Sequence, residues 1–129
     1  DENLSRRRRG IVAKYFVAGT NAITSDGQLV NVDGMGNRVA AQIFGPEKVI
    51  LVAGTNKIVK DVHAAFDRLE KIAAPINAKR VGMATPCADT GECIDCDSPM
   101  RICNMYSIIR RMMFPGRVTL ILVNESLGF

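Results

Sequence analysis

The sequence predicts an α/β domain in which helices flank a mostly parallel sheet, in the three-layer arrangement of Rossmann-like folds. Two near-continuous apolar runs, at 48–53 (KVILVA) and 118–123 (VTLILV), have the composition of strands that are buried on both faces of a parallel sheet. Between them, residues 62–73 carry apolar side chains at helical spacing. Strands that alternate with helices are typical of a parallel sheet, and 129 residues are enough for one such domain with its own core.

The first part of the chain is expected to form a helix and two short strands. The block Arg6–Arg9 follows acidic residues and precedes apolar residues at helical spacing, which is typical of a helix whose arginines are solvated. The apolar run 16–18 and its continuation 22–24 lead to the turn signal Ser25-Asp26-Gly27. A strand over 28–32 completes this part.

The middle of the chain is expected to contain two helices, one before and one after the first apolar strand in the sequence. The earlier helix should cover 38–44, because Gly45-Pro46 stops it. The later helix covers 62–73, and Pro75 should end or kink it. Residues 79–83 then form a connecting segment.

The last part begins with a cysteine loop, residues 85–104, and continues into a predicted helix. The apolar positions of that helix are Ile102, Met105, Tyr106, Ile109 and Met112. Cys103 would lie in its first turn, where the helix dipole favours a thiolate. The cluster 112–114 (Met-Met-Phe) is predicted to pack in the core, and Pro115-Gly116 separates it from the final strand.

The composition argues against several classes of protein. The formal charge of +4 comes largely from Arg6–Arg9, without the interleaved aromatic residues or motifs of a nucleic-acid binder, so no nucleic-acid partner is expected. No apolar run approaches the length of a membrane span, and no secretory signal pattern opens the chain, so the cytoplasm is the expected location. His63, the single histidine, is expected at the surface because nothing near it in sequence completes a catalytic dyad.

All four cysteines lie within the cysteine loop, with the spacing C-x5-C-x2-C-x6-C. They are Cys87, Cys93, Cys96 and Cys103. Four thiols in so short a stretch, two of them in a C-x-x-C pair, predict a metal–thiolate site for zinc or an iron–sulfur cluster. The spacing matches neither standard pattern fully, so two disulfides, or reduced or redox-active thiols, stay open as alternatives.

Two strand ends carry nearly the same sequence and are candidates for a ligand site. They are Gly19-Thr20-Asn21 and Gly54-Thr55-Asn56, and the second is followed by Lys57. Ligands of open α/β sheets bind outside the carboxyl ends of the strands, where these residues would offer hydroxyls, amides and bare backbone. The alternative is that both are ordinary turns that favour Gly and Asn.

A third glycine-bearing loop lies between a predicted strand and a predicted helix. Its candidate residues are Asp33, Gly34, Gly36 and Asn37. The backbone N–H groups at that helix start are suited to an anion, and Arg38 or Lys57 could neutralise it. The loop has neither the Walker pattern nor a full G-x-G-x-x-G, so it does not predict a nucleotide fold.

Four segments together resemble the lactate-utilisation (LUD) domain family, and in particular its four-cysteine branch. They are GTNAITSDGQLVNVDGMGNRVAAQIFGPEKVILVAGTNKIVKDV (19–62), NAKR (77–80), TPCADTGECIDCDSPMRICN (85–104) and VTLILVNESLGF (118–129). The resemblance covers residues 1–129 as the carboxyl-terminal part of one LUD-like domain, and it implies a further upstream segment. An incomplete sheet edge could then pair with another chain, as in a homodimer.

The resemblance also implies a fold like that of ribose-phosphate isomerase, glucosamine-phosphate deaminase and the CoA transferases. Asn21 stands where the similar motif of methylthioribose-phosphate isomerase has Asp, which argues against isomerase chemistry. The family implies a cytoplasmic protein of lactate oxidation that works beside iron–sulfur and flavin partner proteins. We therefore expect a metal–thiolate accessory or redox component or, alternatively, an enzyme or sensor that binds a sugar phosphate, a carboxylate or a CoA ester.

Overall fold

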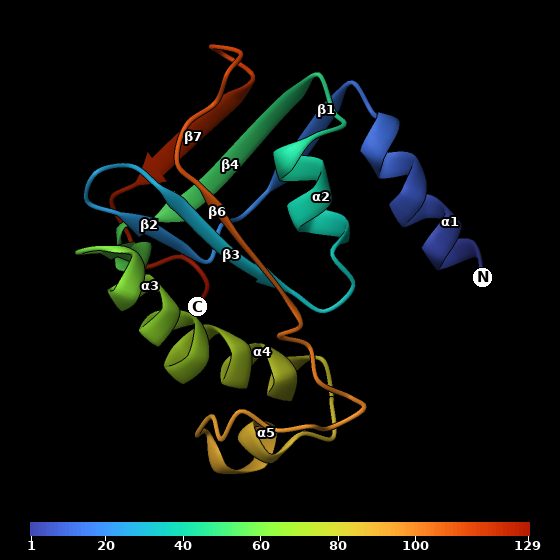
Figure 1. Cartoon of the computed structure of the whole chain (residues 1–129), viewed down its shortest axis with the longest axis vertical. Helices are drawn as coiled ribbons and strands as arrows, with labels where there is room; N and C mark the ends of the chain where they lie inside the picture. The colour runs from blue at the N-terminus through green and yellow to red at the C-terminus, as the bar shows by residue number, and fades with distance from the viewer.

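The computed structural model describes residues 1–129 (Figure 1). The first half of the chain contains α1 (Glu2–Arg9), β1 (Tyr15–Ala18), β2 (Ala22–Thr24), β3 (Leu29–Asp33), α2 (Asn37–Ile43), β4 (Lys48–Gly54) and β5 (Ile58–Val59). The second half contains α3 (Val62–Arg68), α4 (Ala74–Arg80), α5 (Pro86–Thr90), β6 (Met105–Ile109) and β7 (Val118–Val123). Three short turns complete the chain: the 3₁₀ turns η1 (Gly10–Val12) and η2 (Thr55–Lys57), and the π-helical turn η3 (Leu69–Ala73).

The strands form two sheets that pack face to face. The parallel sheet has the order β1-β4-β7, and the mixed sheet has the order β5-β2-β3-β6. Buried residues of both sheets, such as Leu51 and Leu29, meet in one core cluster. On its other face the mixed sheet packs against the rod formed by α3, η3 and α4, where Val30 meets Leu69 (Figure 1). The predicted α/β class, with a parallel sheet and flanking helices, is confirmed.

A hairpin in the mixed sheet determines where the loops meet. Strands β2 and β3 pair antiparallel, with Ala22 opposite Val30, across a turn that contains Gly27 at φ +88°. The start of β2 and the end of β3 therefore lie at the same end of the sheet. Because Gly19–Asn21 connects β1 of the parallel sheet to β2, this connection crosses between the two sheets beside the end of β3.

The helix predicted over 62–73 is longer than expected. α3, η3 and α4 follow without a break, so Pro75 neither ends nor kinks the rod, and residues 79–80 are helical rather than connecting (Figure 1). A proline ring removes one backbone hydrogen bond and needs space in the preceding turn. The wider π-helical turn lies directly before Pro75 and supplies that space.

The helix predicted over 102–112 is wrong, because this segment forms β6. Ser107 and Ile109 are buried while Tyr106 and Ile108 are exposed, which is the period-two pattern of a strand. A short apolar run fits the helical and the strand period equally well. Here antiparallel pairing with the neighbouring strand β3 favours the strand.

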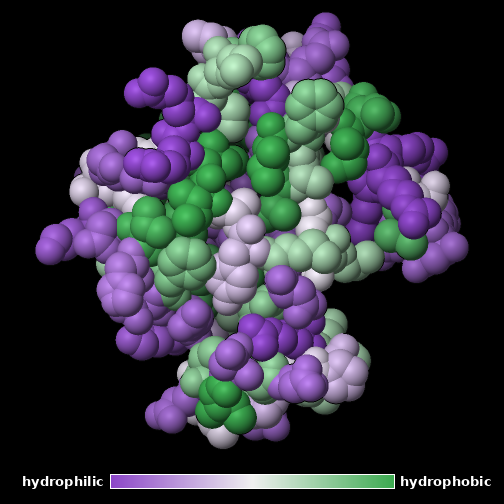
Figure 2. All heavy atoms as spheres, viewed as in Figure 1, coloured by the Kyte–Doolittle hydropathy of each residue, from purple (hydrophilic) through white to green (hydrophobic).

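Two predictions of burial are also wrong. The outer face of the parallel sheet lies at the surface, with Val17 65% and Ile121 46% exposed, so its strands are buried on one face only. Of the methionine–phenylalanine cluster, only Met112 packs against the core, whereas Met113 and Phe114 are 86% and 67% exposed. Figure 2 shows apolar side chains gathered at the surface in the upper half of the molecule, in the region of the two sheets.

Candidate functional site

Arg38, in the first turn of α2, holds the ends of three strands together. Its Nε and Nη2 bind Asp33 Oδ1 at 3.0 and 2.9 Å. Nη1 donates to Gly19 O at 3.2 Å and to Asn31 Oδ1 at 2.7 Å. Nη2 donates to Asn21 Oδ1 at 2.6 Å and to a backbone carbonyl of β3 at 2.9 Å. A guanidinium has five N–H donors, and here they are committed to the protein itself, so Arg38 acts as a structural cation.

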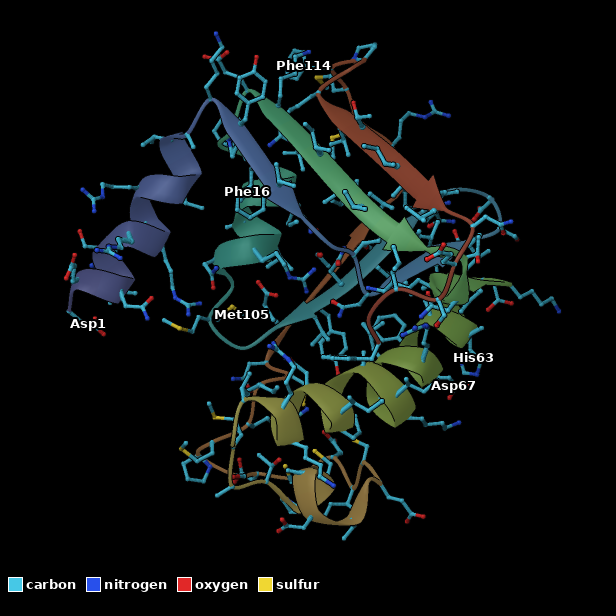
Figure 3. All side chains as sticks on the ribbon, turned by 180° about the vertical axis from the view of Figure 1, so that it is seen from behind. Asp1, Phe16, His63, Asp67, Met105 and Phe114 are labelled. Atoms are coloured by element: carbon cyan, nitrogen blue, oxygen red, sulfur yellow. The ribbon has the colours of Figure 1, made fainter.

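Asp33 uses its second carboxylate oxygen to begin α2. Its Oδ2 accepts from the backbone N–H groups of Arg38 and Val39, both at 2.9 Å. Gly36 occupies the N-cap position at φ +81° and has no side chain to cap the helix. A Cβ on Gly36 would overlap the sulfur of Met105, and Figure 3 shows Met105 beside the loop that leads into α2. The helix-start amides predicted to hold an anion are thus partly occupied by Asp33.

Asn31 and Asn21 direct their side-chain oxygens toward hydrogen-bond donors of the protein. Asn31 Oδ1 accepts from Thr20 Oγ1 and from the Asn21 backbone N–H, both at 3.0 Å, as well as from Arg38. Asn21 Oδ1 accepts from the Val32 backbone N–H at 3.0 Å. The oxygen positions are fixed by donors, so the Nδ2 groups have the opposite orientation. The Nδ2 of Asn31 is buried without a partner, and that of Asn21 makes no hydrogen bond within the protein.

Lys57 ends η2 and is buried, with 8% of its surface exposed. Its Nζ forms neither a hydrogen bond nor an ion pair. It lies close to two glycines, because a Cβ on Gly128 would be 3.5 Å and a Cβ on Gly19 would be 3.9 Å from it. Burial lowers the pKa of Lys57 below its ordinary value, and the charges of Arg68 and Arg38 lower it further.

Arg68, on α3, adds a second buried cation behind Lys57. It is 7% exposed, and its Nε donates to Asn56 O at 3.3 Å. Its Nη1 has no partner, and burial lowers the pKa of Arg68. The charges of Arg38 and Arg68 thus both act on Lys57. The carboxylate side chain that pairs with one of these cations is that of Asp33, which binds Arg38. The neighbourhood of Lys57 has an excess of positive charge.

Asn21, Asp33, Arg38 and Lys57 border a cleft of about 610 Å³ between the β3–α2 loop and α4, whereas Arg68 does not line it. The cleft brings together eight of the ligand residues predicted from the sequence: Gly19, Thr20, Asn21, Asp33, Gly34, Asn37, Arg38 and Lys57. Its lining also includes residues that sequence reasoning missed, such as Arg7, Asn77, Arg80 and Phe129. Asn77 and Arg80 lie three residues apart on one face of α4. That spacing indicates that the two side chains lie next to each other on the helix surface, so it could have predicted their joint place in the cleft. Nothing in the sequence indicates Arg7.

Four predicted ligand residues do not line the cleft, namely Gly36, Gly54, Thr55 and Asn56. The last three hold the segment that follows β7. Thr55 N donates to Glu125 O at 3.1 Å, and Asn56 exchanges hydrogen bonds with Leu127 N and Gly128 O at 3.1 and 3.2 Å. The two Gly-Thr-Asn copies therefore differ in role, since the first lines the cleft and the second positions Lys57 and Gly128.

The family model for the LUD domain matches residues 1–123. The chain belongs to the LUD domain family. Membership confirms the resemblance to this family and associates this LUD domain with lactate utilisation, while assignment to the four-cysteine branch stays a prediction. Searches of the curated proteins and of the solved structures found no match. None of the helices in this LUD domain combines the length and apolar character that crossing a membrane requires.

The cysteine loop of this LUD domain contains four free, half-buried thiols. Cys87 lies on α5, and the other three lie in the irregular segment before β6. Arg101 organises that segment by donating to Cys96 O at 2.7 Å and to Cys103 O at 3.2 Å, and by pairing with Asp95 at 2.8 Å. No three Cys, His, Asp or Glu side chains are grouped so as to hold a metal ion. The thiols are thus not gathered around one point in this structure, and zinc or iron–sulfur binding stays a prediction.

The thiolate predicted at Cys103 is wrong in its physical basis. Cys103 precedes a strand, so it has no helix dipole to stabilise a negative charge. Burial raises the pKa of Cys103, and the charges of Cys93 and Cys96 act in the same direction, against the lowering effect of Arg101. The protonated thiol is therefore favoured relative to an ordinary cysteine.

The cysteine loop and the cleft share a boundary. Asn104 donates from its backbone to Asp33 O at 3.0 Å and from its side chain to Gly34 O at 3.3 Å. Ile102 lines the cleft, and a Cβ on Gly34 would lie 3.3 Å from Ile102 Cα. A change in the conformation of the cysteine loop would thus reach the β3–α2 loop directly.

Replacing Arg38 is expected to destabilise the domain. Arg38→Met removes the donors for several part-buried acceptors and leaves Asp33 without its cation, which should cost about 3 kcal/mol of unfolding free energy. Urea unfolding followed by circular dichroism measures this. Arg80→Met is the matched control, because Arg80 is exposed and its side-chain hydrogen bonds reach only Asn77 on the same helix. Equal stabilities of the two variants would contradict the structural role of Arg38.

Replacing Lys57 is expected to stabilise the domain at neutral pH. The unfolded chain binds a proton at Lys57 more tightly than the folded chain does, so wild-type stability should rise as the pH increases from the lowered pKa toward 10.5. Lys57→Met removes this cost and should gain about 1 kcal/mol at pH 7, with the gain shrinking as the pH nears 10.5.

Thermal unfolding of both proteins across this pH range measures the gain. Lys60→Met is the control, because Lys60 is exposed. A Lys57→Met variant that is less stable than wild type at pH 7, or whose difference from wild type does not change with pH, would contradict the assignment of Lys57 as a costly buried amine.

Proposed function

We propose that this LUD domain binds a small organic anion in the cleft, with a carboxylate as the favoured group, in support of lactate utilisation. The observation that carries the proposal is Lys57, a buried amine without a counter-ion beside Arg38 and Arg68. Burying a cation without a partner is costly, so such a side chain is retained where a ligand supplies the missing anion.

The charges around the cleft support the same conclusion. Four cationic side chains line it, Arg7, Arg38, Lys57 and Arg80, against the single carboxylate of Asp33. Asp33 is committed to Arg38 and to the start of α2, so it does not offset the other cations. A cleft with an excess of one charge sign concentrates ligands of the opposite sign.

Size and chemistry favour a metabolite over a macromolecule. A cavity of about 610 Å³ lies in the range that holds small ligands. Lys57 Nζ and the Nδ2 of Asn21 are donors without internal partners, and both residues line the cleft. A carboxylate accepts hydrogen bonds from such donors, and the association of the family with lactate utilisation favours a small hydroxy or oxo acid.

Calorimetric titration tests this function. L-lactate, pyruvate, inorganic phosphate, a sugar phosphate and a CoA ester are titrated separately, and we expect a small carboxylate to bind with an affinity that falls as the salt concentration rises. Lys57→Met should weaken binding about tenfold or more through the lost charge-assisted contact, while Lys60→Met should bind as wild type does. Absence of binding for every ligand, or unchanged binding by Lys57→Met, would overturn the proposal.

A redox role of the cysteine loop is the second candidate. The observation that favours it is the half-buried C-x-x-C pair, whose thiols lie near enough to Cys103 to raise its pKa, on a loop that contacts the cleft. Such a role would suit iron–sulfur or flavin partner proteins, and bound zinc or an iron–sulfur cluster belongs to the same proposal.

Protein purified without oxygen tests this second role. We expect stoichiometric zinc or iron, or a reversible loss of two thiols on mild oxidation, and Cys93→Ser should abolish either signal. The control is Ser98→Ala, a change in the same loop that leaves every thiol in place. Metal-free protein in which all four thiols resist mild oxidation would contradict it.

A further inference from the structure

We propose that Lys57 is a nucleophile that forms an imine with the carbonyl group of a small 2-oxo acid bound in the cleft. The inference rests on the proposed anion binding and names the substrate class and a reacting atom. The observations are the burial of the Lys57 side chain, its lack of partners, its cationic neighbours and the space around its nitrogen.

The first observation is that the Lys57 amine is unoccupied. Two other lysines hold hydrogen bonds, Lys48 Nζ to Gly116 O at 2.8 Å and Lys71 Nζ to Asp67 at 2.8 Å. The remaining lysines, Lys14, Lys60 and Lys79, are exposed to water. Lys57 is buried and yet forms neither a hydrogen bond nor an ion pair. An ammonium in that position is poorly solvated, so the neutral amine, which has the lone pair that a nucleophile needs, is easier to form than at an exposed lysine.

The second observation is the arrangement of cations around Lys57. Arg68 is buried with its Nη1 unpartnered, and the charges of both Arg68 and Arg38 act on the Lys57 amine. A lysine that is desolvated and placed next to another cation is an established arrangement for an activated amine. The same positive field that lowers the pKa of Lys57 attracts the carboxylate of an oxo acid, so ligand capture and nucleophile activation have one cause.

The third observation is the space around the nitrogen. Gly19 and Gly128 flank it, and side chains at either position would enter the volume next to Nζ. The backbone beside Lys57 is fixed, since Asn56 is bonded to both Leu127 and Gly128. The backbone that carries Lys57 is therefore fixed at the wall of the cleft, and the open volume beside the amine can admit a carbonyl carbon.

The reaction is a condensation without a change of oxidation state. The lone pair of Lys57 Nζ forms a bond to C2 of the oxo acid, and the carbonyl oxygen takes up both amine protons and leaves as water. The product is a C2=Nζ imine, and hydrolysis reverses the step. The carboxylate of the ligand stays intact and remains paired with the positive field of the cleft. Lactate has no carbonyl group and cannot react in this way, whereas its two-electron oxidation product can.

Trapping with borohydride tests the inference on the intact domain. Pyruvate is equilibrated with the protein at pH 7, sodium borohydride reduces any imine to a stable secondary amine, and tandem mass spectrometry locates the adduct. We expect Lys57 to be labelled at least about tenfold faster than each exposed lysine, because the cleft holds the oxo acid next to its amine and burial favours the neutral form of that amine. L-lactate in place of pyruvate should give no adduct.

Two variants complete the test. If a variant fails to fold, the position of the adduct in the wild-type protein still decides the question. Lys57→Arg should lose the fast adduct, and Lys60→Arg should keep it. Equal labelling of all lysines, or none, in protein that binds pyruvate by calorimetry would overturn the imine while leaving the anion site in place. Protein that neither binds nor reacts with pyruvate would overturn both this inference and the choice of ligand class.

Discussion

The contact between Arg38 and Asp33 is the interaction on which the arrangement of this domain depends. One guanidinium donates to the Asp33 carboxylate and to the carbonyl and amide oxygens of the Gly19–Asn21 connection. The parallel and mixed sheets share no strand, so the Gly19–Asn21 crossing and the end of β3 need a tie between them. A planar cation with five fixed donors serves this purpose better than a lysine would, because it bonds several acceptors at once in a defined geometry.

Near this ion pair, the buried cations differ in whether they have partners. Arg38 is fully engaged and contributes structure, while Lys57 and the outer nitrogen of Arg68 are buried with bonding capacity unused. Unpaired buried cations lower stability, and their place beside an open cleft supports the proposed anion site. The cysteine loop reaches this site through Asn104 and Ile102, which gives any change in its thiols a short physical route to the cleft.

The sequence predicted much of this fold where the pattern was strong and local. The strands at 48–54 and 118–123 and the helix after Gly36 follow from apolar runs, spacing and glycine positions. The strand at 105–109 did not, because so short and mostly apolar a run fits both the helical and the strand period, and only pairing with β3 decides between them. The convergence of Gly19, Asn21 and Lys57 was predictable from strand ends. The burial of Arg68 was not, since on a helical wheel it lies off the apolar stripe. Nor does the spacing of Gly54–Asn56 reveal that these residues bind the chain's last segment rather than a ligand.

The ionisation of Lys57 tests the central claim most directly. Site-resolved nuclear magnetic resonance of lysine side chains labelled at the ε-carbon follows it during a pH titration, with and without pyruvate. The account predicts that Lys57 titrates below the ordinary lysine value of 10.5 in the free domain, shows the same displacement in high salt, and shifts when the oxo acid is added. A Lys57 resonance that titrates at 10.5 and does not respond to the acid would contradict it.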